Sequence, residues 1–191
     1  MDLFKFTIFF GIILMTLGTL FLLNRSSLNK IIRDFPRSKV MAFSLMTIGL
    51  VWFIYRHILN LSEADFGDYK MIIMAITLFI FASSFIFTKD FLAVRGLSII
   101  LLLFAREALD AAYLQEPVAR LYFVSLTYVI IVFALYFGAW PYRLRDFNNW
   151  LFKFETRSRN FGYCIFISGM IMLASTLKYW MLLWRVLFFS Y

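Results

Sequence analysis

The sequence has very little of the residue types that build metal and redox sites. Its 191 residues include one cysteine, Cys164, and one histidine, His57. A single cysteine excludes an intramolecular disulfide, and the two residues together cannot form the Cys/His cluster that zinc, haem or an iron–sulfur centre requires. No metal site is therefore expected, and no cofactor can be named from the sequence.

Motifs of the common enzyme classes are also absent from the sequence. It contains no Walker loop, no Gly-x-Ser-x-Gly, no His-Glu-x-x-His and no Rossmann fingerprint. The polar connections between its apolar runs are too short to hold a soluble catalytic domain. Nothing in the sequence argues positively for an enzyme.

The chain is rich instead in apolar and in basic residues. Hydrophobic residues make up 63% of it, whereas roughly 45–50% is usual for a soluble domain. The formal net charge is +8, and in a membrane protein an excess of Lys and Arg reflects orientation more often than nucleic-acid binding. These values predict an integral membrane protein in contact with the lipid bilayer and with no nucleic-acid partner.

Six apolar runs are long enough to cross a hydrocarbon core, which takes about 20 residues in a helix. We therefore expect an all-α, polytopic integral membrane protein: one domain over 1–191 in which six transmembrane helices form a bundle of three antiparallel hairpins. The expected spans are 4–23, 40–59, 70–87, 91–114, 121–140 and 161–184. The last run is longer than one span needs, so it either crosses fully or bends onto the surface, which would leave five spans.

Two connections between these runs are basic and amphipathic. Segments 26–36 and 142–156 repeat apolar residues at helical spacing among many Lys and Arg residues. This pattern is typical of a helix that lies on the membrane surface. The predicted contacts with anionic lipid headgroups, or with a partner, are Arg25, Lys30, Arg33, Arg37, Lys39, Arg143, Arg145, Lys153, Arg157 and Arg159.

The charges of the connections predict an orientation. The connections after the first and fifth runs are net basic, and those after the second and fourth are net acidic. The positive-inside rule then places the interfacial helices in the cytoplasm and both termini on the outer side. We expect a bacterial-type cytoplasmic membrane. The first run is expected to be a retained helix, because the segment before it lacks the basic n-region of a signal peptide.

A short motif recurs in the three basic turns. Arg33-Asp34-Phe35, Lys89-Asp90-Phe91 and Arg145-Asp146-Phe147 repeat a basic-Asp-Phe triplet at equal intervals of 56 residues. This spacing is consistent with a tandem triplication of a two-helix hairpin. The alternative is coincidence, because phenylalanine is abundant here and hairpins of equal length would space any turn residue evenly.

The fourth run, 91–114, differs from the others because it carries four charged residues. Arg95 lies in its first turn and is expected to reach the inner headgroups, whereas Arg106, Glu107 and Asp110 lie near its outer end. Ionisable groups at membrane depth are costly and usually face a protein interior or a water-filled cavity. We therefore expect this helix to be surrounded by other helices.

Near the outer end of the second run the sequence places Arg56 and His57 at a depth similar to that of the charges on the fourth run. The predicted polar or ion cluster is therefore Arg56, His57, Arg106, Glu107 and Asp110. Its functional interpretation is a site for an ion, a proton or an anionic group, with His57 titrating near neutral pH. Its structural interpretation is a salt-bridged network at headgroup level.

Three functions are consistent with these features. The first is a non-catalytic multi-pass membrane subunit that packs within a larger or homo-oligomeric assembly, with other membrane subunits or copies of itself as partners. The second is a small ion or solute transporter or channel that uses the outer charged cluster. The third is a membrane protein that binds a lipophilic cofactor or a lipid.

Overall fold

The computed structural model describes residues 3–62, 66–87, 90–115 and 120–189, with the side chains of Ser27 and of residues 177–189 outside the description. In these residues every regular element is helical and there is no strand. The predicted all-α class is therefore confirmed.

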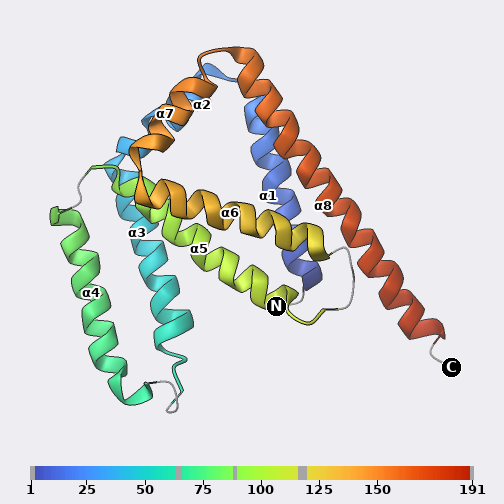
Figure 1. Cartoon of the computed structure of the whole chain (residues 1–191), viewed down its shortest axis with the longest axis horizontal. Coiled ribbons are helices and arrows are strands. Elements are labelled where there is room, and N and C mark those ends of the chain that lie inside the picture. Colours follow the sequence, from blue (N-terminus) through green and yellow to red (C-terminus); the bar gives the residue numbers. More distant parts are fainter. Residues whose placement is uncertain (1–2, 63–65, 88–89, 116–119, 190–191) are drawn as a thin grey trace. The chain divides into compact units, whose positions relative to one another are not determined.

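The elements follow one another along the chain with short connections (Figure 1). In chain order they are α1 (Leu3–Leu23), α2 (Ser26–Asp34), the 3-10 turn η1 (Phe35–Arg37), α3 (Lys39–Phe53), the π-helical turn η2 (Ile54–Ile58), the 3-10 turn η4 (Gly67–Tyr69), α4 (Lys70–Phe87), α5 (Leu92–Ala112), α6 (Arg120–Ala139), α7 (Tyr142–Leu151) and α8 (Glu155–Phe189).

Four helical stretches in the described residues are long and apolar enough to cross a membrane. They are Leu3–Leu23, Lys39–Ile58, Gly67–Phe87 and Arg120–Ala139. Helix α5 has the length of a span but carries the four charges noted above, and much of the later part of α8 lies outside the described side chains. The structure thus supports a helical protein of membrane type, and the six-span bundle stays a prediction.

Both predicted interfacial segments form helices. The first, α2 with η1, matches the expected range 26–36 closely. The second, α7, ends at Leu151, earlier than the expected 156, because α8 already begins at Glu155. Glu155, in the first turn of α8, stabilises the positive end of the helix dipole.

The chain forms two compact units. The first comprises residues 1–30, 105–130 and 148–191, and the second comprises residues 31–104 and 131–147. Helices α5 and α6 each contribute to both units.

The first unit is organised by close packing of α1 against α8. A Cβ atom added to Gly18 would lie 2.7 Å from the backbone nitrogen of Phe166, and one added to Gly169 would lie 2.9 Å from that of Met15. Gly11 and Gly162 meet the same partner helices near Leu173 and Leu22. Residue numbers rise along α1 as they fall along α8, so the helices are antiparallel. Small residues allow such close approach of two helices.

The second unit has a small apolar core where the first turns of α3 and α5 meet α4. Buried Ala42 and Met46 of α3 contact buried Leu92 and Ala93 of α5. Phe35, Phe81 and Phe85 cover this cluster and are themselves partly buried. The core therefore combines small residues with large rings.

Candidate functional site

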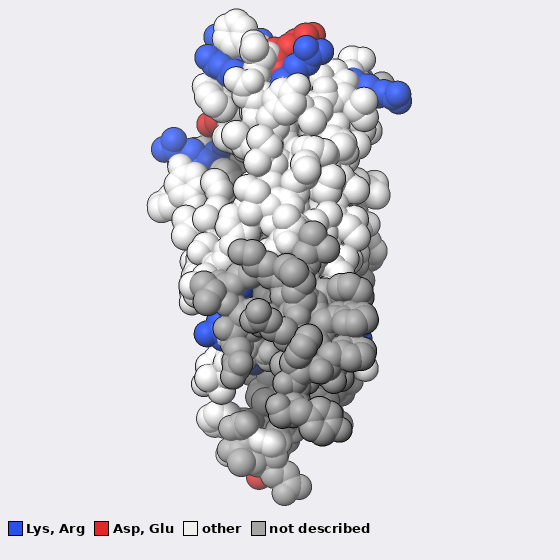
Figure 2. Space-filling model, turned by 90° about the vertical axis from the view of Figure 1, so that its right-hand side faces the viewer, with Lys and Arg blue, Asp and Glu red and all other residues white. Residues whose placement is uncertain are grey.

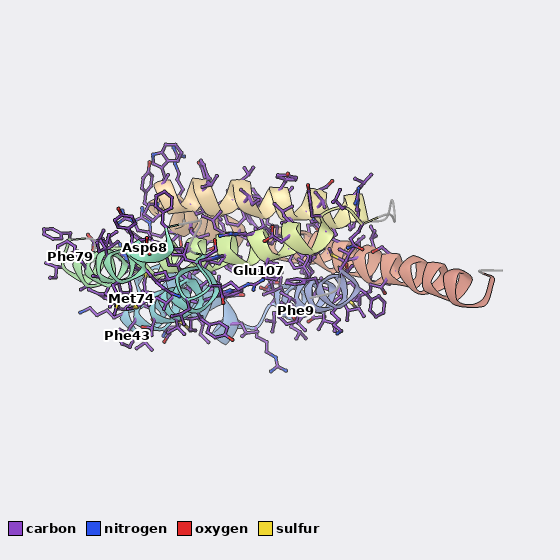
Figure 3. All side chains as sticks on the ribbon, turned by 90° about the horizontal axis from the view of Figure 1, so that it is seen from below. Phe9, Phe43, Asp68, Met74, Phe79 and Glu107 are labelled. Carbon is purple, nitrogen blue, oxygen red and sulfur yellow. The ribbon has the colours of Figure 1, made fainter. Side chains whose placement is uncertain are left out.

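Helix α4 has two unlike sides. Phe81 and Phe85 pack on the core of the second unit. On the opposite side lie Ile72, Ile76, Phe79 and Ile86, each more than half exposed. At about 100° per residue these four side chains share a sector of roughly 80°, which we call the outer face of α4. Figure 3 shows labelled Phe79 projecting from the helix.

The outer face belongs to the least covered of the apolar helices. None of the 18 residues of α4 is buried, whereas α1 and α3 each bury several residues. The helix is apolar along its whole length and has no charged residue after Lys70. The outer face of α4 is therefore the clearest candidate surface for contact with lipid or with another membrane helix.

The predicted basic contacts lie in the two interfacial helices and in the residues that flank them. Those that are exposed are Arg25, Lys30, Arg33, Arg37, Lys39, Arg143, Lys153 and Arg159, and those that are half-buried are Arg145 and Arg157. Figure 2 shows the face that α8 presents, where Lys and Arg, with Asp or Glu among them, gather at the end at which α8 begins. A side-chain hydrogen bond with Tyr142 raises the pKa of Arg143 above its usual value.

Arg157 is engaged by aromatic rings close to it in sequence. Its guanidinium carbon lies 4.8 Å from the ring centre of Trp150 and 4.7 Å from that of Phe154. Its Nη1 also donates a hydrogen bond of 3.4 Å to the carbonyl oxygen of Trp150. Cation–π contacts of this kind stabilise a local conformation. Arg157 therefore supports the turn between α7 and α8, a role that the sequence interpretation as a lipid contact did not include.

Phe91 brings residues from both basic segments together in the second unit. The guanidinium carbons of Arg37 and Arg145 lie 5.9 and 5.8 Å from the centre of its ring. Phe91 itself has φ 59°, a left-handed conformation that is unusual for a bulky residue. Sequence reasoning missed this meeting point, and its only signal was the membership of Phe91 in the repeated triplet.

Arg56 and His57 of the predicted outer cluster lie in the π-helical turn η2. The side-chain amide of Asn60 donates hydrogen bonds to the carbonyl oxygens of Tyr55 (3.0 Å) and Arg56 (3.2 Å). The ring of His57 lies 5.4 Å from that of Phe53, and its side chain is half-buried. Single π turns are rare in helices and often occur at functional sites. The sequence did not predict this change of helix type.

The other three members of the cluster lie on the part of α5 that belongs to the first unit. Arg106 and Asp110 are exposed and Glu107 is half-buried, whereas Ala105, Ala108 and Ala112 are buried. This part of α5 therefore buries its alanines. Because the two sets of residues belong to different units, their pairing stays a prediction, as does a transporter that would use it.

The described residues contain no group of three or more His, Cys, Asp or Glu side chains that could hold a metal ion. Cys164 is exposed on α8. Searches for similar proteins add no further assignment: no protein-family model, no curated protein and no solved structure matches this chain.

Proposed function

We propose that this protein is a non-catalytic multi-pass membrane subunit that packs within a larger or homo-oligomeric membrane assembly through the outer face of α4. The observation that carries the proposal is that an 18-residue apolar helix buries none of its residues. Its companions differ, because α1 buries Gly11 and Gly18 and α3 buries Gly49.

The physical argument rests on what holds helices together in a bilayer. Lipid tails are as apolar as the helices, so association depends on van der Waals packing and interhelical hydrogen bonds and gains little from the hydrophobic effect. Helix α4 obtains limited packing from its own chain. A helix of a neighbouring subunit, or of a second copy, that contacts Ile72, Ile76, Phe79 and Ile86 would supply the missing contacts.

We infer further that the chain crosses a bacterial-type cytoplasmic membrane six times, with α2 and α7 on the cytoplasmic side and both termini outside. Four apolar helices and two amphipathic basic helices support this topology. Labelling by a membrane-impermeant thiol reagent tests it in a Cys164→Ser background. Asp68→Cys should react in intact cells, and Lys30→Cys should react only after lysis.

The assembly is tested by native mass spectrometry of the full chain extracted in mild detergent. The wild-type protein should carry the mass of a homo-oligomer or of a complex, and the pair Ile76→Ala and Phe79→Ala should shift it to the mass of the single chain. The matched control is Phe9→Ala with Ile12→Ala, which removes the same two residue types from exposed positions of α1. A wild-type monomer, or equal loss in both double variants, would contradict the proposal.

A further inference from the structure

A hollow of about 290 Å³ opens in the second unit where α3 begins, α4 ends and α5 begins. Its walls are mostly apolar and include Ala42, Phe43, Phe85 and Ala93. Ligand pockets usually measure roughly 300–1,000 Å³. The hollow is thus too small for a whole lipid, but its size and lining suit part of a hydrocarbon chain.

The mouth of this hollow is cationic. Arg37 and Lys39 belong to its lining, and both side chains are exposed. Ser38 lies between them and caps α3, where its hydroxyl accepts a hydrogen bond of 3.3 Å from the backbone nitrogen of Met41. The positive end of the α3 dipole therefore adds to the two formal charges. An apolar hollow with a cationic mouth is complementary to an amphiphile with a negative head.

A second hollow, of about 180 Å³, lies farther along the same three helices. It is lined by Gly49 and Phe53 of α3, by Thr77 and Ser84 of α4 and by Ile99 of α5, together with further apolar residues. The two hydroxyls donate hydrogen bonds of 2.8 Å to carbonyl oxygens of their own helix, those of Ile73 and Ile80. Because their hydrogen-bonding needs are met in this way, the second hollow requires no polar group from a ligand.

The two hollows lie in series along α3. The first borders Ser38 to Phe43 and the second borders Met46 to Phe53, so together they follow the whole helix. With 15 residues, α3 is about 22 Å long at the usual rise of ~1.5 Å per residue. That length exceeds half of a hydrocarbon core of about 30 Å. A hydrocarbon chain that starts at the cationic mouth can therefore follow the seam through one leaflet.

We propose that the seam between α3 and α4 is a binding site for one anionic phospholipid, with its phosphate at Arg37 and Lys39 and one acyl chain along the two hollows. The proposal goes beyond the assembly function, because the hollows lie on the side of α4 that faces α3 and the outer face lies on the opposite side. The two are therefore tested by different residues and by different measurements.

The first test compares retention of two lipids by the full chain in detergent, followed by native mass spectrometry. Dioleoylphosphatidylglycerol should be retained in preference to dioleoylphosphatidylcholine, which has the same chains but no net charge. Arg37→Ala with Lys39→Ala should weaken retention of the anionic lipid about thirtyfold. Each cation near the membrane surface raises the affinity for an anionic lipid about fivefold, and the double variant loses two of them. The matched control is Lys30→Ala with Arg33→Ala, which removes two exposed cations from α2 outside the hollow.

The second test concerns the acyl chain of the lipid. Ser84→Leu places a larger side chain in the second hollow, so it should weaken retention of the dioleoyl lipid and leave retention of dihexanoylphosphatidylglycerol unchanged. Melting temperatures that are no lower than that of the wild-type protein establish that the variants fold. If the Ser84 variant is destabilised, Thr77→Leu serves instead. Three results would each overturn the proposal: an equal loss of lipid retention in the α2 control, no preference for the anionic lipid, or no dependence of retention on the length of the acyl chain. None of them depends on the mass of the assembly.

Discussion

The contacts of α1 with α8 and the seam between α3 and α4 are both made by long apolar helices, yet different residue types make their closest contacts. In the first pair glycines spaced seven residues apart on each helix bring the backbones into contact. In the second pair aromatic rings fill the seam, with Phe43 and Phe81 each beside Phe85 at 6.0 and 5.1 Å between ring centres. Hollows of about 290 and 180 Å³ remain there.

The comparison shows that apolar helices of similar composition can stabilise the fold in one helix pair and leave room for a ligand in another. A seven-residue spacing keeps small residues on one side of a helix, so two such sides meet along their whole length. In the seam between α3 and α4, spaces remain beside the rings that the protein itself does not fill. The α1/α8 contact is therefore suited to hold the fold together, and the α3/α4 seam to receive a ligand.

The largest expected effect is at Gly18. In Gly18→Ala the new Cβ would meet backbone and side-chain atoms of Phe166 at 2.7–2.8 Å, so one helix must shift. We expect the free energy of unfolding to fall by about 1–3 kcal/mol, measured by thermal or denaturant unfolding in detergent. Alanine is otherwise the better helix former by about 1 kcal/mol, so a gain in stability would contradict the close contact.

A smaller effect of opposite sign is expected from filling the second hollow. Ser84→Leu replaces a half-buried hydroxyl that donates a hydrogen bond to the carbonyl oxygen of Ile80 in its own helix. The added methyl groups would contact apolar residues that line the hollow, and cavity filling commonly raises stability by about 0.5–2 kcal/mol. Unfolding measured after removal of lipid should show this gain, and a clear loss would mean that the seam is already tightly packed.

The smallest effect is expected at Gly49 of α3, which, like Gly18, is a glycine that faces a neighbouring helix. A Cβ there would lie 3.2 Å from a terminal methyl carbon of Ile99, a side chain that is 40% exposed and can move. The contact and the better helix propensity of alanine should nearly cancel, so we expect a change within about 0.5 kcal/mol. A loss as large as that of Gly18→Ala would remove the distinction between the two helix pairs.

The sequence predicted most of the helices because hydropathy and periodicity are local properties. The expected spans 70–87 and 121–140 match α4 and α6 to within one residue, and both interfacial segments are helical. The change to a π turn at Ile54–Ile58 was missed, since one inserted residue in a helix leaves no mark on an apolar pattern. The triplication also stays a hypothesis, because the first hairpin has one helix in each unit.

The candidate sites were predicted less well. The basic residues were identified as a group, but the roles of Arg37, Arg145 and Arg157 depend on particular rings, and Phe91 was not among the candidates. The charged residues of α5 were predicted to belong to a polar or ion cluster, because charges are rare in apolar runs. In the structure the alanine side of that helix is the buried one.

By itself, the sequence determined the helical class, the membrane character and the basic amphipathic segments, because each follows from the composition and spacing of neighbouring residues. Only the tertiary structure decided that α1 packs on α8, that α4 leaves a whole side uncovered, and that a cationic mouth opens onto an apolar seam. These features depend on which side chains meet across long stretches of chain. In a bilayer, where all apolar surfaces are equally well solvated, the fit between such side chains selects the partner of each helix.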